Sequence, residues 1–167
     1  KYNQRCAECA SALADLQRVY PDISCLRDVS VAMFETAADR VSDPVCRKRA
    51  EHVVTECDRV LRSVEALSRG DLCAFGRLMN ESHDSLRDLY EVTGTHLDTM
   101  VSLSRKAPGC IGSRMTGAGF GGCTVSLVAE DCVDRFTEEV FSGYREATGL
   151  EPEFYVTAAF DGAKEIF

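Results

Sequence analysis

The chain has 167 residues and a net charge of −8, from 19 basic and 27 acidic side chains. This length predicts a single domain over residues 1–167, and the acidic surface disfavours binding to nucleic acid or to an anionic membrane. No apolar run approaches the roughly 18 residues of a membrane span, and the sequence carries no signal-peptide pattern. We therefore expect a soluble, cytoplasmic protein.

Nine cysteines, an odd number, are scattered among apolar positions, where they serve as small hydrophobes. Cys6 and Cys9 form a lone C-x-x-C pair, and no second C-x-x-C or C-x-x-H completes a zinc site. We expect neither a metal site nor redox chemistry, and abundant unpaired thiols indicate a reducing compartment. Because the chain begins with Lys1 next to a predicted helix, we also expect it to be part of a longer protein.

The first half of the chain predicts amphipathic helices over residues 3–20, 30–41 and 43–69. Ser30 and Asp43 are suited to cap the second and third helices, and Pro44 suits the first helical position of the third. Apolar residues of the third helix step by three and four, which predicts a core-facing stripe of Cys46, Ala50, Val53, Cys57, Val60, Val64 and Leu67. The basic run Arg47–Arg49 is assigned to a solvated face.

The second half predicts helices and strands together. Asp71 is suited to cap a helix that continues to about residue 89, a shorter helix covers residues 95–105, and Asp131 is suited to cap a helix closed by Gly149. Strands are predicted at residues 111–116, 123–128, 154–158 and 166–167, the second with one buried face. The expected fold is α+β: a helical first half followed by a ββαβ antiparallel sheet covered by helices.

A glycine loop connects the first two strands, with Gly117, Gly119, Gly121 and Gly122 in six residues. Glycine permits positive φ and close approach of another group, so this spacing predicts a strained, tight turn at the tip of a hairpin. Successive backbone N–H groups in such a turn suit a phosphate or a sugar hydroxyl. The same glycines also suit a purely structural turn, and neither G-x-G-x-x-G nor a Walker A pattern is present.

Few titratable residues stand out as catalytic groups. The three histidines, His52, His83 and His96, are interpreted as structural hydrogen-bonding groups, since no motif pairs them with a nucleophile or carboxylate. Four acidic residues lack any paired-carboxylate pattern and are assigned to solvated surfaces: Glu81, Asp84, Asp88 and Asp161. Arg114, alone in an uncharged stretch, either pairs with a phosphate or attaches the loop to a carboxylate.

Four strings, in order along the chain, carry a resemblance to a known family: Tyr2-Asn3-x-Arg5 with Cys9, the segment Gly70–Thr93, the loop string GSRMTGAGFGGC, and the tail Asp161–Lys164. The loop string resembles the third sequence motif of the galactokinases, within the GHMP family of small-molecule kinases. The other three strings are similar to further galactokinase segments. Ala118 stands where many members have Gly, and it resembles a variant also found in the family.

The resemblance implies a ferredoxin-like GHMP kinase carboxy-terminal fold, in a parent enzyme that uses ATP and Mg²⁺ to phosphorylate the 1-hydroxyl of galactose. It implies that Tyr2 binds the sugar and that a loop lies beside the nucleotide phosphates, formed by Gly117, Ala118, Gly119, Phe120, Gly121 and Gly122, with support from Ser113, Arg114, Met115 and Thr116. The catalytic carboxylate and the magnesium ligands would belong to a missing amino-terminal domain, which meets this chain at residues 1–20. We therefore assign no catalytic residue and no metal ligand here, and expect the chain to be inactive alone.

Rival interpretations remain. A non-catalytic galactokinase-like sensor would bind sugar and nucleotide and act through protein contacts, and its distinguishing features would lie outside this chain. A plain α+β interaction domain would make the four resemblances coincidental, and a GHMP kinase acting on homoserine or mevalonate fits the segment Gly70–Thr93 less well. If the chain is one domain of a larger enzyme, we expect exposed apolar side chains on its surface.

Overall fold

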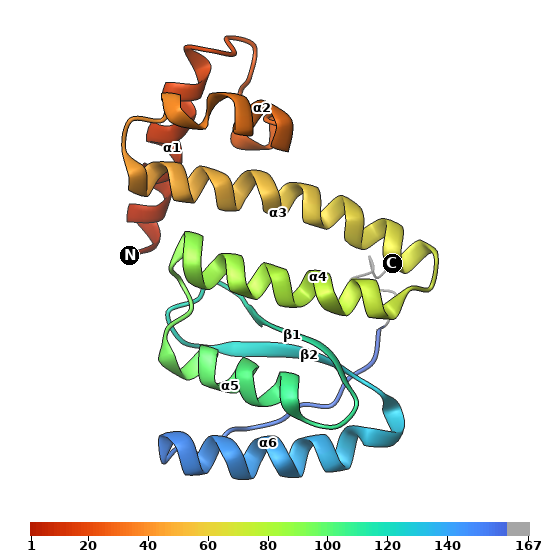
Figure 1. Cartoon of the computed structure of the whole chain (residues 1–167). Helices are drawn as coiled ribbons and strands as arrows, with labels where there is room; N and C mark the ends of the chain where they lie inside the picture. The colour runs from red at the N-terminus through yellow and green to blue at the C-terminus, as the bar shows by residue number, and fades with distance from the viewer. Residues whose placement is uncertain (160–167) are drawn as a thin grey trace, which may run out of the picture.

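The computed structural model describes residues 1–159, which form helices on either side of a two-stranded sheet (Figure 1). The helices are α1 (Tyr2–Gln17), α2 (Val31–Ala37), α3 (Pro44–Ser68), α4 (Leu72–Ser85), α5 (Thr95–Lys106) and α6 (Val133–Thr148), and the strands are β1 (Cys110–Thr116) and β2 (Cys123–Val128). Short 3₁₀ turns occupy Leu26–Asp28, Ala38–Arg40 and Glu130–Cys132, and a π-helical turn, Leu86–Tyr90, extends α4. The predicted α+β class is confirmed. Within residues 1–159, every helix is too short or too polar to cross a membrane.

The helix starts follow the capping residues of the sequence. Ser30, Asp43 and Asp71 each accept a backbone N–H of the following helical turn through a side-chain oxygen, which satisfies a donor that the helix itself leaves unpaired. The prediction for Asp131 was wrong. That residue lies inside a 3₁₀ turn, and α6 begins after it, at Val133.

The first hydrophobic cluster joins α1, α2 and the N-terminal half of α3 (Figure 1). Its most deeply buried members come from all three helices and the loops between them: Ala12, Leu16, Val29, Phe34, Ala37, Val41, Ala50 and Val54. Helices α1 and α2 therefore each bury an apolar face against α3, as their sequence period predicts.

The C-terminal half of α3 does not join this cluster, and the prediction of a continuous core stripe was wrong there. Val60, Val64 and Leu67 are 55%, 58% and 48% exposed, and the neighbouring Leu61 is 71% exposed. These residues continue the face that α1 and α2 cover nearer the start of α3, but α1 and α2 end before reaching them (Figure 1). This face therefore carries exposed apolar side chains of the kind expected for one domain of a larger enzyme, and its contact with another domain stays a prediction.

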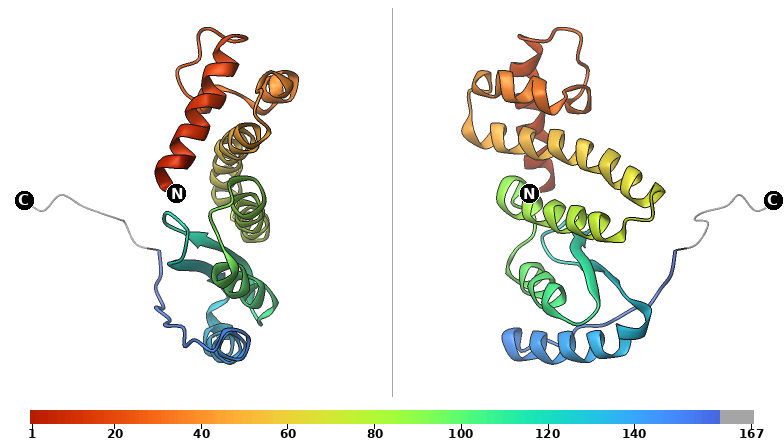
Figure 2. Two further views of the ribbon diagram at one scale, coloured as in Figure 1. Left: turned by 90° about the vertical axis from the view of Figure 1, so that its left-hand side faces the viewer. Right: turned by 45° about the vertical axis from the view of Figure 1, so that its right-hand side comes forward.

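Helix α4 lies between α3 and the sheet, and it approaches β1 closely (Figures 1 and 2). The contact depends on two glycines: a Cβ on Gly76 would overlap the Ile111 carbonyl, and a Cβ on Gly112 would come within 2.5 Å of the Gly76 carbonyl oxygen. On the far side, α5 and α6 form a separate cluster around Ala107, Phe136 and Val140. The hairpin is thus held between two helical layers.

The described sheet contains only β1 and β2, which pair antiparallel from Thr116 opposite Cys123 back to Cys110 opposite Val128. The third strand predicted at residues 154–158 was wrong: Phe154 packs near α5 and α6, while Tyr155 and Val156 are exposed and unpaired with the described sheet. Alternation of apolar residues cannot by itself supply a neighbouring strand. The predicted strand at residues 166–167 and the string Asp161–Lys164 lie outside the described residues.

Candidate functional site

The loop between β1 and β2 has the backbone that its glycines predict. Gly117, Gly119, Gly121 and Gly122 all have positive φ, from 78° to 113°, and Phe120 shares this conformation with φ of 60°. A positive φ is costly for a residue with a side chain, so Phe120 is held there by its surroundings. The tight turn at the tip of a hairpin is confirmed.

The loop rests on the backbone at Val92. The Phe120 N–H donates to the Val92 carbonyl at 2.6 Å, and a Cβ on Gly119 would overlap the same carbonyl oxygen. Val92 is itself buried in a cluster with Leu97 and Met115. Only glycine at residue 119 allows this close approach, which fixes the loop against the chain that follows α4.

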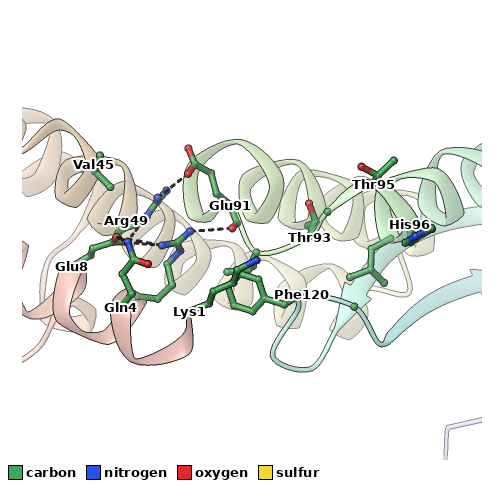
Figure 3. Close-up of a pocket in the computed structure, with 15 residues that line it drawn as sticks. Lys1, Gln4, Glu8, Val45, Arg49, Glu91, Thr93, Thr95, His96 and Phe120 are labelled. Atoms are coloured by element: carbon green, nitrogen blue, oxygen red, sulfur yellow. Dashed lines mark hydrogen bonds and ion pairs between the residues drawn. The ribbon is translucent and has the colours of Figure 1, made fainter.

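A cavity of about 590 Å³ opens beside the loop (Figure 3). Its lining comes from Lys1 and the first turns of α1, from Val45 and Arg49 near the start of α3, from residues 91–97, and from Phe120 and Gly121 of the loop. The Lys1 ammonium lies 5.3 Å from the centroid of the Phe120 ring, which is within range of a cation–π contact. The loop is therefore one edge of a concave site.

Two arginines and two carboxylates, Arg5, Arg49, Glu8 and Glu91, are among the residues that line this cavity; Figure 3 labels Arg49, Glu8 and Glu91. Arg49 donates to Glu8 at 2.8 Å and to Glu91 at 2.9 Å, and Arg5 pairs with Glu8 at 3.0 Å. The hydrogen bond from Arg49 lowers the pKa of Glu91. The assignment of Arg49 to a solvated face was wrong: its side chain is buried, because these carboxylates compensate its charge.

The residues predicted to support the loop lie along β1. Ser113 is fully buried, and its N–H donates to the Asn80 side chain at 2.9 Å. Arg114 forms an ion pair with Glu56 at 3.4 Å. Of the two predicted partners, a phosphate or a carboxylate, the structure supplies the carboxylate. Met115 is buried in the cluster that contains Val92, and Thr116 is exposed at the end of the strand.

Tyr2, the residue assigned to the sugar, lies on the first turn of α1 and is 66% exposed. Its neighbours Lys1, Gln4 and Arg5 line the cavity, whereas Tyr2 itself is outside the lining. The structure therefore brings the start of α1 and the glycine loop to one site, with the Tyr2 ring at the surface nearby.

His83 is a buried structural group whose Nδ1 is hydrogen-bonded, while its Nε2 faces Asp98 without hydrogen-bond geometry. Its Nδ1 accepts the Met115 N–H at 3.2 Å, and its Nε2 lies 3.3 Å from an Asp98 carboxylate oxygen. This arrangement requires the proton on Nε2, and burial lowers the pKa of His83. Sequence reasoning missed Asp98 because it lies on α5, fifteen residues further along the chain.

The other two histidines differ in their surroundings. His52 is buried between α3 and α4, where its Nδ1 lies 2.8 Å from the Ser85 hydroxyl and its ring stacks on Tyr90. Burial lowers the pKa of His52 to about 4, so the ring is neutral near pH 7. His96 is exposed at the rim of the cavity.

The acidic residues considered as catalytic substitutes face arginines. Asp84 pairs with Arg105 at 2.9 Å and with Arg87 at 3.2 Å, Asp88 pairs with Arg87, and Asp161 is outside the described part of the chain. Glu81 lies near arginines of α3. In residues 1–159, no group of three histidine, cysteine or acidic side chains is placed to hold a metal ion.

Comparison with known proteins gives a consistent result. The family described as GHMP kinases C terminal matches residues 63–145. The galactokinases of Clostridium beijerinckii and Clostridium acetobutylicum are 52% and 55% identical over 166 residues, covering 99% of this chain and 42% of each relative. The crystal structure of Lactococcus lactis galactokinase complexed with galactose superposes with a TM-score of 0.88 at 44% identity, over 92% of this chain and 39% of that one.

The chain therefore spans less than half the length of these relatives. At this identity the match extends well beyond shared fold, and it covers the loop, the cavity and both helical layers. The chain belongs to the GHMP kinase family and is homologous to the carboxy-terminal part of galactokinases.

Proposed function

We propose that this chain forms one wall of the active site of a galactokinase, which transfers the γ-phosphate of ATP to the 1-hydroxyl of galactose. The observation that carries the proposal is the glycine loop beside the cavity, in a chain more than half identical to two galactokinases. The loop residues Gly117–Gly122 would contact the phosphates and sugar through backbone N–H groups. Residues 113–116 would support the loop, and Tyr2 would contact the sugar.

Phosphoryl transfer needs donors around the phosphates, magnesium, and a carboxylate that orients the acceptor hydroxyl. Magnesium would neutralise charge on the transferred phosphate, but residues 1–159 offer no cluster of ligands for it. We therefore assign the magnesium ligands and the catalytic carboxylate to an amino-terminal domain of the same polypeptide. ATP, galactose and that domain are the partners we propose, and the nine free cysteines favour a cytoplasmic location.

The alternative of a non-catalytic sensor has less support, because the relatives named above are all described as galactokinases. Coupled ADP release with galactose and Mg-ATP tests the proposal, measured on the full-length polypeptide and on this chain side by side. We expect activity in the full-length polypeptide and none in the chain. If the full-length polypeptide binds galactose and ATP but releases no ADP, it is a sensor; activity in the isolated chain would refute our division of roles.

A further inference from the structure

The segment Leu89–Val92 contacts the glycine loop through the Val92 carbonyl. The three backbone carbonyls before it accept hydrogen bonds from arginine side chains. The last carbonyls of a helix have no partner within the helix. Here the Leu89 carbonyl accepts from Arg49, the Tyr90 carbonyl accepts from Arg5 Nε at 2.6 Å, and the Glu91 carbonyl accepts from Arg5 at 3.1 Å. Two guanidinium groups from α1 and α3 thus bind three consecutive carbonyls.

The two guanidinium groups are held in place in turn. Glu8 receives hydrogen bonds from both Arg5 and Arg49, and the Glu91 side chain accepts from Arg49 at 2.9 Å. Both arginines are buried, at 9% and 2% exposure. Their planar forks fix the direction of each bond, which a lysine ammonium would not do. We name this set, Arg5, Glu8, Arg49 and Glu91, the arginine clamp; its members Glu8, Arg49 and Glu91 are labelled in Figure 3.

The backbone turns sharply where the clamp holds it. Glu91 has φ of 55°, a conformation that a residue with a side chain adopts only under constraint. The next residue, Val92, directs its carbonyl to the Phe120 N–H. The clamp, the strained turn and the glycine loop are therefore connected by consecutive backbone groups.

We propose that Arg5 and Arg49 are positioning residues for the glycine loop: they fix Leu89–Val92 so that the Val92 carbonyl meets Phe120. The effect on loop order follows from this geometry alone. The effect on turnover rests on the proposed function as well. Arg49 is the better target for a test, because it joins α3 to both carboxylates and to the Leu89 carbonyl.

The first experiment measures amide hydrogen exchange by NMR in this chain. In Arg49→Met we expect the Phe120 amide to exchange roughly tenfold faster, whereas the Ser113 amide, held by Asn80, changes by less than about threefold. Arg47→Met is the matched control, since Arg47 lies on the same helix but contacts Asp39 and the Val41 carbonyl. Unchanged Phe120 exchange in a folded Arg49→Met variant would overturn the proposal.

A milder substitution protects the test against loss of folding. Glu91→Gln keeps the shape of the side chain and weakens one charge-assisted bond, so Phe120 exchange should rise by about threefold. If Arg49→Met is unfolded, Phe120 exchange in Glu91→Gln decides the question: an increase supports the clamp, and no change refutes it.

The second experiment measures turnover of the full-length polypeptide. We expect the variants with faster Phe120 exchange to release ADP more slowly. Arg47→Met should turn over at the unmodified rate, and Arg49→Met should be the slowest. Arg49→Lys should lie between them, because it keeps the positive charge. Faster Phe120 exchange without any kinase activity in the unmodified polypeptide would leave the clamp standing and refute the proposed function. Faster exchange with unchanged turnover would refute the effect of the clamp on catalysis.

Discussion

At the scale of single residues, the glycine loop depends on one close approach. Gly119 lies against the Val92 carbonyl, where a Cβ would overlap the oxygen, whereas a Cβ on Gly117 would have free space around it. Both residues have positive φ. The two glycines therefore separate the effect of backbone strain from the effect of a collision with Val92.

Gly119→Ala and Gly117→Ala form a matched pair in the full-length polypeptide. Each adds the strain of a positive φ, about 1–2 kcal/mol, but only Gly119→Ala displaces the loop. We expect Gly119→Ala to lower kcat/KM for ATP roughly 100-fold, as small misplacements in active sites do, while thermal unfolding stays cooperative. Steady-state kinetics check this, and equal losses in the two variants would contradict it.

Buried His52 makes stability depend on pH. Burial lowers its pKa to about 4 in the folded chain, against about 6.5 when unfolded. Between these values only the unfolded chain binds the proton, so the free energy of unfolding should fall as pH drops from about 7 to about 4, by roughly 3 kcal/mol. Urea unfolding across this range measures the slope, and His52→Gln should reduce it, with the buried His83 contributing part of what remains. An equal slope in His52→Gln would assign the effect to other groups.

At the scale of elements, α4 and β1 pack with their backbones in contact. Gly76 and Gly112 face each other across this contact, and a Cβ on either would overlap the other element. Because β1 ends at the glycine loop and α4 leads into Leu89–Val92, this contact sets the distance between the two segments that meet at Phe120. Small residues here thus serve the site as well as the core.

Gly76→Ala tests that contact. The added Cβ has to displace the Ile111 carbonyl, so we expect the free energy of unfolding to fall by about 3 kcal/mol, at the upper end for overpacked cores. Gly70→Ala is the control for an added Cβ without a collision: Gly70 has a positive φ, unlike Gly76, and its surroundings are open, so the strain should cost about 1 kcal/mol. Chemical denaturation of both variants measures the two losses in the free energy of unfolding. Similar losses would show that the contact between α4 and β1 has room to relax.

At the scale of the whole molecule, α3 crosses from a covered to an uncovered environment. Its first half is buried by α1 and α2, while its second half continues beyond them with the same apolar spacing (Figure 2). Between α3 and α4 lie two polar contacts, Glu56 with Ser82 and His52 with Ser85. Separate hydrophobic clusters lie on either side of these contacts.

Substitutions of two valines on α3 test the difference between its covered and uncovered halves. Val54 is 1% exposed and Val64 is 58% exposed. Val54→Ala should lower the free energy of unfolding by about 2 kcal/mol, because it leaves a cavity in the first cluster, whereas Val64→Ala should change it by less than about 0.5 kcal/mol. Urea denaturation of this chain checks both values. A large loss for Val64→Ala would mean that this face is covered in solution.

The local features of this protein were determined by its sequence. Ser30, Asp43 and Asp71 start helices because a side-chain oxygen can reach the first helical turn without help from distant residues. The four closely spaced glycines specify the loop because the ability to adopt a positive φ belongs to each glycine by itself. The resemblance to galactokinases, carried by short contiguous strings, was visible for the same reason. The α+β class followed from the change of period near residue 110.

Tertiary structure alone decided where distant residues meet. Arg49 looked like part of a solvated basic run, and only the approach of Glu8 and Glu91 from other elements compensates its charge and permits its burial. Asp98 reaches His83, and Val92 meets Phe120, across gaps that no local pattern encodes. The exposed half of α3 has the same period as the buried half, because an apolar stripe specifies a face to be covered, while the position of the covering helices decides whether it is.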